Sequence, residues 1–194
     1  MSEILGVLFK YLLAMLAIVA VVAILYEALG SSNTSTAVSD VSQIQANVYQ
    51  LYSATPNSTT AITQSTAADV IGAGVIPSGM KSSTTTGSGS SATTSATILD
   101  PWGGTVGVGT TPTSNAVLAL TFPKVPMGAC AKLVVGAAKA GASVVVGSNT
   151  VYPGDSSMAS DAATACSAAG GSTVAMTFNF YPSSGASNAA GSSS

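Results

Sequence analysis

The sequence contains no histidine, and its five basic residues are all lysines. Charged residues make up 6% of the chain, whereas an ordinary soluble domain has about 25%. Without histidine, neither a Ser-His-Asp nor a Cys-His catalytic arrangement is possible. Five of the seven acidic residues are spread singly through the sequence that follows the apolar segment, which provides no paired carboxylates and no cluster of metal ligands. The composition therefore argues against an enzyme, a metal site and a cofactor site.

A basic surface is also missing. The net charge is −2 at neutral pH, so the chain lacks the electrostatic footprint of a protein that binds nucleic acid. The combination of high hydrophobicity with abundant Ser, Thr and Gly is typical of a surface that is exposed outside the cell or buried against copies of itself. We therefore expect no specific nucleic-acid partner.

Only two cysteines are present, Cys130 and Cys166, and they lie far apart in the sequence. This spacing does not match the CxxC pairs of metal and redox sites. In an exported chain, two cysteines predict one disulfide, which would lower the chain entropy of the unfolded state by about 4 kcal/mol in free-energy terms. The alternative is a pair of unbonded, buried thiols in a reducing compartment.

One long hydrophobic segment dominates the amino-terminal region. From Ile4 to Leu29, Lys10 and Glu27 are the only charged residues. As a helix this segment would be about 39 Å long, enough to cross a bilayer with some tilt. We therefore predict a transmembrane helix within residues 1–30. Glu27 lies at its far boundary, where we expect it to be solvated.

A second helical pattern follows the apolar segment. Gly30, Ser31 and Ser32 predict a weak break in the helix. Beyond it, apolar residues recur at helical spacing as far as about residue 54, with polar residues between them. This stripe should face a globular domain, and it consists of Val38, Val41, Ile44, Val48 and Leu51.

The remainder of the chain predicts a small mixed domain. We expect a short helix over 66–73, an exposed low-complexity loop over 81–97, and strands within 98–109 and 116–126. A helix should cover 127–140, with Cys130, Leu133, Val134 and Ala137 on its inner face. A hairpin over 142–153 should follow, then a short helix or loop carrying Cys166, and a last strand over 172–182. The fold class is α+β: a long hydrophobic helix continues into an amphipathic helix packed on a small antiparallel sheet, with a carboxy-terminal region closed by a disulfide.

This order divides the chain into two parts. Residues 1–54 form the long helix, of which 1–30 are the apolar half and 31–54 the amphipathic half. Residues 55–194 form a head domain, and its small polar end, 183–194, should be a mobile surface tail.

Several segments together resemble the type IV pilins, and among them the type IVb class of thin conjugative and enteric pili. They are "VSQIQANVYQLYSATPNSTT", "VIGAGVIPSGM", "ILDPWGGTVGVG" and "LTFPKVPMGACAKLV", which follow an apolar helix with an early glutamate. The resemblance covers residues 1 to about 181 and implies a filament subunit with a carboxy-terminal disulfide. Glu3 departs from the pattern, because it lies two positions earlier than the glutamate of the family's mature chains. Either Met1 is the mature, methylated terminus, or cleavage follows Gly6 and removes Glu3; we expect the first.

Glu3 and Lys10 need a physical explanation, since a charge at the centre of a bilayer costs about 2.5–3.5 kcal/mol or more. Seven residues separate them, about 10.5 Å along a helix, so they cannot pair within one chain. In parallel copies staggered by that rise, Glu3 of one chain meets Lys10 of another. The resemblance implies a second partner for Glu3, the Met1 amine of a neighbour. The alternative is that both side chains extend to the headgroups at the membrane surface.

Three functional hypotheses follow. The first is the major subunit of a type IVb pilus at the bacterial surface, in which the chain polymerises with itself after leaving the inner membrane. Its other partners would be the assembly machinery and the prepilin peptidase, and the pilus would serve conjugation, adhesion or aggregation. The second is a secreted or periplasmic domain, because "ALG" before Ser31 satisfies the cleavage rule for signal peptides. The third is a monomeric binding module anchored in the membrane.

Overall fold

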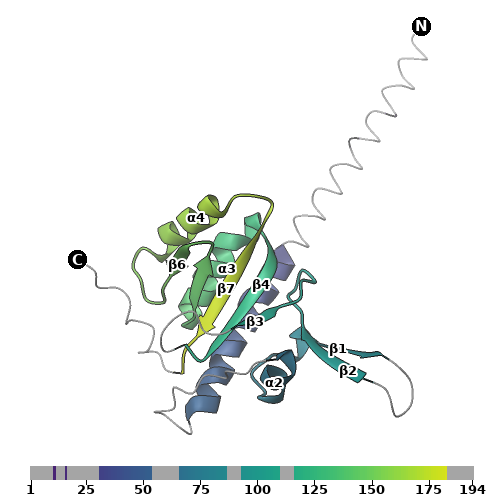
Figure 1. Ribbon diagram of the computed structural model, residues 1–194. Coiled ribbons are helices and arrows are strands. Elements are labelled where there is room, and N and C mark those ends of the chain that lie inside the picture. Colours follow the sequence, from purple (N-terminus) through teal and green to yellow (C-terminus); the bar gives the residue numbers. More distant parts are fainter. Residues whose placement is uncertain are drawn as a thin grey trace. The chain divides into compact units, whose positions relative to one another are not determined.

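The computed structural model of the protein, shown in Figure 1, describes residues 11, 16, 31–53, 66–86, 93–109 and 116–182. The chain divides into two compact units, Met1–Asn33 and Thr34–Ser194. Within the second unit, a helix precedes strands that pair only in antiparallel fashion. The predicted α+β class is therefore confirmed.

Residues 31–53 are helical, and one face of this helix is part of the core. The buried apolar side chains are Ala37, Val41, Ile44, Val48 and Tyr52. The sequence predicted this stripe correctly except at its carboxy-terminal end, and Val38 at its start is partly buried and packs against the core. Leu51 is 44% exposed, and Tyr52 takes its place in the core. At 100° per residue, Tyr52 lies nearer to the direction of Val41 and Val48 than Leu51 does.

The helix includes Ser31 and Ser32, which we had expected to interrupt it. Gly30 lies outside the described residues, so the break predicted at that position stays a prediction. The amide N–H of a serine can still join the helical hydrogen-bond ladder, and serine lowers helix stability only by a few tenths of a kcal/mol, about as much as most polar residues do.

The predicted helix over 66–73 is confirmed as α2, Ala67–Gly72. It begins with a capping box, in which the Thr66 side chain accepts from the Asp69 amide and the Asp69 carboxylate accepts from the Thr66 amide. A short 3-10 turn, Ser78–Met80, then leads into the next strand.

The low-complexity segment is not the loop that we expected. Lys81–Thr86 forms strand β1, and Thr93–Ile98 forms strand β2. The two strands pair antiparallel in continuous register, from Lys81 opposite Ile98 to Thr86 opposite Thr93. Threonine has a high strand propensity, and the buried side chains of Met80 and Ile98 hold the base of the hairpin in the core.

The main sheet has five antiparallel strands in the order β3-β4-β7-β5-β6. They are β3 Gly107–Gly109, β4 Leu118–Pro126, β5 Ser143–Val146, β6 Asn149–Val151 and β7 Thr173–Phe180. The last strand in sequence is thus the centre of the sheet, between β4 and β5. Its Phe178 ring meets Phe122 of β4 edge to face, with the ring centroids 4.9 Å apart. The predicted strands within 116–126 and 172–182 and the predicted hairpin are confirmed.

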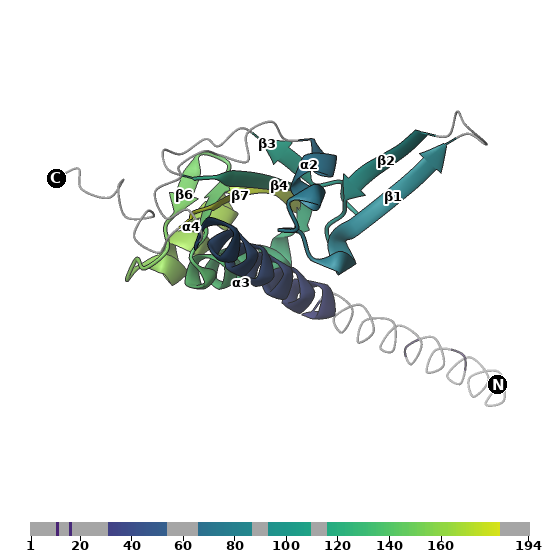
Figure 2. The same ribbon diagram turned by 90° about the horizontal axis from the view of Figure 1, so that it is seen from below.

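Helix α3, Met127–Ala140, and helix α4, Met158–Ala169, complete the described part of the head. All four residues predicted for the inner face of α3 are buried. For the segment 155–171 the sequence allows either a short helix or a loop, and the structure has the helix α4 there. Figure 2 shows the helix of residues 31–53 and α3 on the same side of the sheet.

Candidate functional site

The residues predicted to direct assembly lie outside the described part of the chain. This holds for Met1, Glu3, Lys10 and Gly30, so their roles stay predictions. Within the apolar segment, Tyr11 and Leu16 are described; both are helical, with 71% and 57% of their surface exposed. None of the helices formed by the described residues is both long and apolar enough to cross a membrane. The segment for which we predicted a span falls almost wholly outside those residues.

The described half of the amino-terminal helix is fixed to the head by a very close approach to α3. A Cβ atom added to Gly136 would lie 2.7 Å from Cγ1 and 2.8 Å from Cγ2 of Val38. Further along, a Cβ atom on Gly141 would lie 2.7 Å from the Tyr49 hydroxyl, and Gly141 also has a φ of +101° as the carboxy-terminal cap of α3. Glycine at these two positions therefore lets the two helices pack against each other.

Polar side chains of the same helix add hydrogen bonds to distant segments. The Gln45 amide donates to the carbonyl oxygen of Tyr181 at 2.9 Å, directly after β7. The Asn47 amide donates to the carbonyl oxygen of Val75 at 3.0 Å, directly after α2. Through these two bonds the helix is tied to two segments of the head that lie far from it in the sequence.

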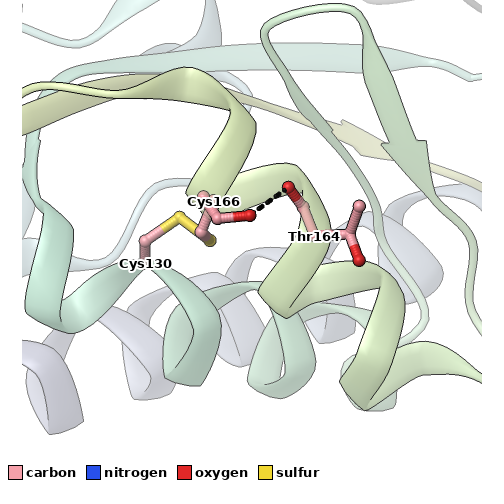
Figure 3. The surroundings of a disulfide bond; sticks show 4 residues. Cys130, Thr164 and Cys166 are labelled. Atoms are coloured by element: carbon pink, nitrogen blue, oxygen red, sulfur yellow. Dashed lines mark hydrogen bonds between the residues drawn. A yellow bond between two sulfur atoms is a disulfide. The ribbon is translucent and has the colours of Figure 1, made fainter.

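The disulfide joins helices α3 and α4. Cys130 on α3 and Cys166 on α4 are bonded, with their Cα atoms 6.0 Å apart, and both residues are buried. Figure 3 shows this bond between the helices, with Thr164 on α4 two residues before Cys166. The carbonyl oxygen of Thr164 accepts from the Ser167 hydroxyl at 2.9 Å. The predicted disulfide is confirmed.

A tight turn after β2 contains the sequence "DPWGG". The Asp100 Oδ1 atom accepts from the backbone amides of Trp102, at 2.9 Å, and Gly104, at 2.8 Å. A Cβ atom on Gly104 would lie 2.5 Å from Asp100 Oδ2, so glycine is required there. Asp100 Oδ2 and Trp102 Nε1 are both buried and make no hydrogen bond within the described part of the chain. The turn fixes the path of the chain between β2 and β3.

The outer face of α3 carries two of the four lysines of the head. Lys132 and Lys139 are exposed and flank a shallow depression, which is lined also by Ala131, Val135, Gly136 and, from α4, Ala159. Among the described residues, no three His, Cys, Asp or Glu side chains lie close enough together to hold a metal ion.

An amphipathic helix packed on an antiparallel sheet, with a carboxy-terminal region closed by a disulfide, is the architecture that the sequence led us to expect for a pilin. The family model described as "PilS N terminal" matches residues 31–179. The chain therefore belongs to the PilS family, and its predicted membership in the type IV pilins is confirmed.

A crystal structure of the type IV b pilin from Salmonella typhi is similar to this chain. The two are 23% identical with a TM-score of 0.49, and the match covers 76% of this chain and 99% of the Salmonella chain. A search of curated proteins found no match.

Proposed function

We propose that this pilin is the major structural subunit of a type IVb pilus and polymerises through its amino-terminal apolar helix. The observation that carries the proposal is the family match across residues 31–179 together with the apolar segment directly before it. Residues 31–53 directly follow the apolar segment in the sequence, and their buried stripe belongs to the core of the head. In this proposal a filament core made of apolar helices would therefore carry the heads at the filament surface. In this proposal residues 1–54 are the helix and 55–194 the head.

The cohesion of such a filament comes from apolar surface. Burying a Leu, Ile, Val or Phe side chain contributes about 1.5–3 kcal/mol, and the segment from Ile4 to Leu29 is made mostly of such residues and alanine. In the inner membrane lipid covers this segment, and in the filament neighbouring copies replace the lipid. The proposal includes a prepilin peptidase that matures the chain, methylation at Met1, and an assembly machinery that extracts the chain from the membrane.

Glu3 and Lys10 set the register in this proposal. An ion pair between neighbouring copies stabilises little after desolvation, but a single unpaired charge in an apolar core costs several kcal/mol. Staggers that leave Glu3 without a cation are therefore disfavoured. The contact thereby selects one arrangement of the helices from many that bury similar apolar area.

A charge exchange tests this contact. Glu3→Lys and Lys10→Glu should each reduce the yield of sheared surface filaments by at least about tenfold, since each leaves like charges opposed in the filament core. The double variant should restore a measurable part of that yield, whereas a Glu27→Lys control should change it little. Filaments are counted by electron microscopy, and immunoblots of whole cells show that each variant is made. Failure of the double variant to exceed both single variants would contradict the Glu3–Lys10 pairing and leave the Met1 amine as the partner of Glu3.

The role of the pilus in conjugation, adhesion or aggregation belongs to the same proposal. The Ser/Thr-rich surface and the low charge of the head favour contacts with other surfaces, because few charged groups must be desolvated. A strain that lacks this chain should lose surface filaments and, with them, mating on a solid surface or attachment. Expression of the unchanged chain from a plasmid should restore both.

A further inference from the structure

The β1–β2 hairpin contributes few side chains to the core of the head. The two strands form a separate two-stranded sheet and, within the described residues, pair with no strand of the main sheet. Figures 1 and 2 both show this ribbon projecting from the body of the head. Met80 and Ile98 are buried at its base, whereas Ser83, Thr84 and Ser95 are exposed further out.

A ribbon of this kind is not stable through its own contacts. A two-stranded hairpin is marginal in water and normally needs a third strand or an apolar face. Here the residues beyond the base are almost all Ser and Thr, which supply strand propensity but little apolar area to bury. The outer edge of β1 therefore carries a row of backbone groups suited to pairing with a further strand.

Strand β1 itself carries none of the sequence features that usually protect an exposed edge. Proteins protect such edges with lysines, prolines, bulges or short strands. Strand β1 has six residues, no proline, and a register without shifts, and its one charge, Lys81, lies at the base. Because β1 has none of these features, nothing in its sequence prevents a further strand from pairing with its outer edge.

The length of this edge indicates its partner. The terminal strands of the main sheet, β3 and β6, have three residues each, so neither can pair along the whole of β1. Among the described strands at a sheet edge, only those of the ribbon have six residues. Strand β2 contacts α2, which leaves β1 as the more open of the two.

We infer that β1 is a docking edge for β1 of a second copy of this chain, and that the two ribbons join into a four-stranded antiparallel sheet. Such a contact is isologous, with a two-fold axis near Ser83 or Thr84. In either register Lys81 lies opposite a residue at least four positions away, so the two lysines do not oppose each other. Two-fold related subunits cannot be successive subunits of one polar filament. Given the proposed function, the contact therefore joins subunits of neighbouring filaments.

Single-cysteine variants test the contact. The native cysteines are bonded to each other, so an introduced cysteine is the only free thiol in the described part of the chain. In a two-fold contact a central residue meets its own copy, and directly opposed Cβ atoms lie about 4.5–5.5 Å apart, near disulfide range. Under mild oxidation of sheared filaments, Ser83→Cys or Thr84→Cys should give disulfide-linked dimers. Ser148→Cys, at the exposed tip of the β5–β6 hairpin, is the matched control and should not.

A charge variant provides a second readout. Thr84→Lys places like charges opposite or diagonal to each other across the two-fold axis, and Ser148→Lys makes the same charge change elsewhere. Because many ribbons line each filament, Thr84→Lys should reduce low-speed sedimentation of filaments by at least about tenfold, while Ser148→Lys should not.

The outcomes separate this inference from the proposed function. Single filaments with no dimer from either ribbon cysteine, or with dimers equal to those of Ser148→Cys, would overturn the ribbon contact and leave the filament proposal standing. A lack of filaments from the unchanged chain would overturn the filament proposal. In that case cross-linking of the detergent-solubilised full chain still decides whether the ribbons pair.

Discussion

At the scale of single residues, two positions show how closely the amino-terminal helix and the head are fitted. Gly136 and Val38 come from distant parts of the sequence, and neither is unusual by itself. The sequence placed Val38 on the inner stripe and α3 in its correct range, but it gave no sign that the two helices meet at Gly136. A close approach of this kind depends on the angle between two helices, which no local pattern encodes.

Substitution of Gly136 tests this fit. Gly136→Ala should destabilise the head by about 1–3 kcal/mol because the new methyl group overlaps Val38. Gly128→Ala, on the same helix with open space around it, should stabilise by up to about 1 kcal/mol. Urea unfolding followed by the fluorescence of Trp102, the only tryptophan, measures both. Val38→Ala should rescue Gly136→Ala; equal destabilisation with and without Val38 would contradict the packing.

Two aspartates should show opposite pH dependence. Burial raises the pKa of Asp40 above its ordinary value of 3.8, so the ionised form destabilises the folded state at neutral pH. The Thr66 side chain, followed by its backbone amide, lowers the pKa of Asp69, so the stabilising contribution of Asp69 is present above pH 3.8 and is lost as the pH falls through the lowered pKa. Asp40→Asn should therefore stabilise at pH 7, and Asp69→Asn should destabilise.

The pKa shifts of the two aspartates also predict the pH at which the stability effects of Asp40→Asn and Asp69→Asn disappear. The gain from Asp40→Asn should shrink as the pH falls through the raised pKa of Asp40 and should vanish below 3.8, where the carboxyl is protonated in both states. Thermal unfolding of both variants between pH 3 and 7 measures the two slopes. A gain from Asp40→Asn that grows toward acid would contradict the assignment.

At the scale of secondary-structure elements, most of the head could be predicted from the sequence. The prediction was wrong for one segment, where it rested on amino-acid composition alone. In strands β4 and β7 and in helix α3, apolar residues recur with strong strand or helix periodicity. The structure buries the faces that this periodicity predicts. The segment 81–97 has no apolar periodicity, so it was interpreted as a loop. Its order comes from Met80 and Ile98 at the base, and from the strand propensity of threonine, neither of which a compositional argument weighs. The helical face of residues 31–53 was also predicted correctly, apart from a small rotation at its end that buries Tyr52 instead of Leu51.

The disulfide between α3 and α4 carries a prediction at this scale. Its two cysteines are 36 positions apart, so replacing both with alanine restores chain entropy to the unfolded state and should cost about 2–4 kcal/mol. Urea unfolding of the Cys130→Ala/Cys166→Ala chain measures the loss. Reduction of the unchanged chain with a thiol should shift the midpoint by a similar amount, and an unchanged midpoint in both experiments would contradict the role assigned to the bond.

At the scale of the whole molecule, the family was accessible from the sequence because several short motifs pointed to one class together with the apolar helix and the two cysteines. The contacts that build a filament were not accessible to the same degree, since they depend on surfaces of neighbouring copies. Glu3 and Lys10 were noticed because charge is rare in an apolar segment. The ribbon edge was found only from the structure, because its Ser/Thr composition gives no signal of a contact.

The central claim is that this chain builds a surface filament with its apolar helix retained. The most direct test is the intact mass and amino-terminal sequence of the protein in filaments sheared from cells. We predict a subunit that begins at Met1, carries one added methyl group, and is lighter by two hydrogens because Cys130 and Cys166 are bonded. A subunit that begins near Ser31, or a sheared filament fraction without this chain, would contradict the account.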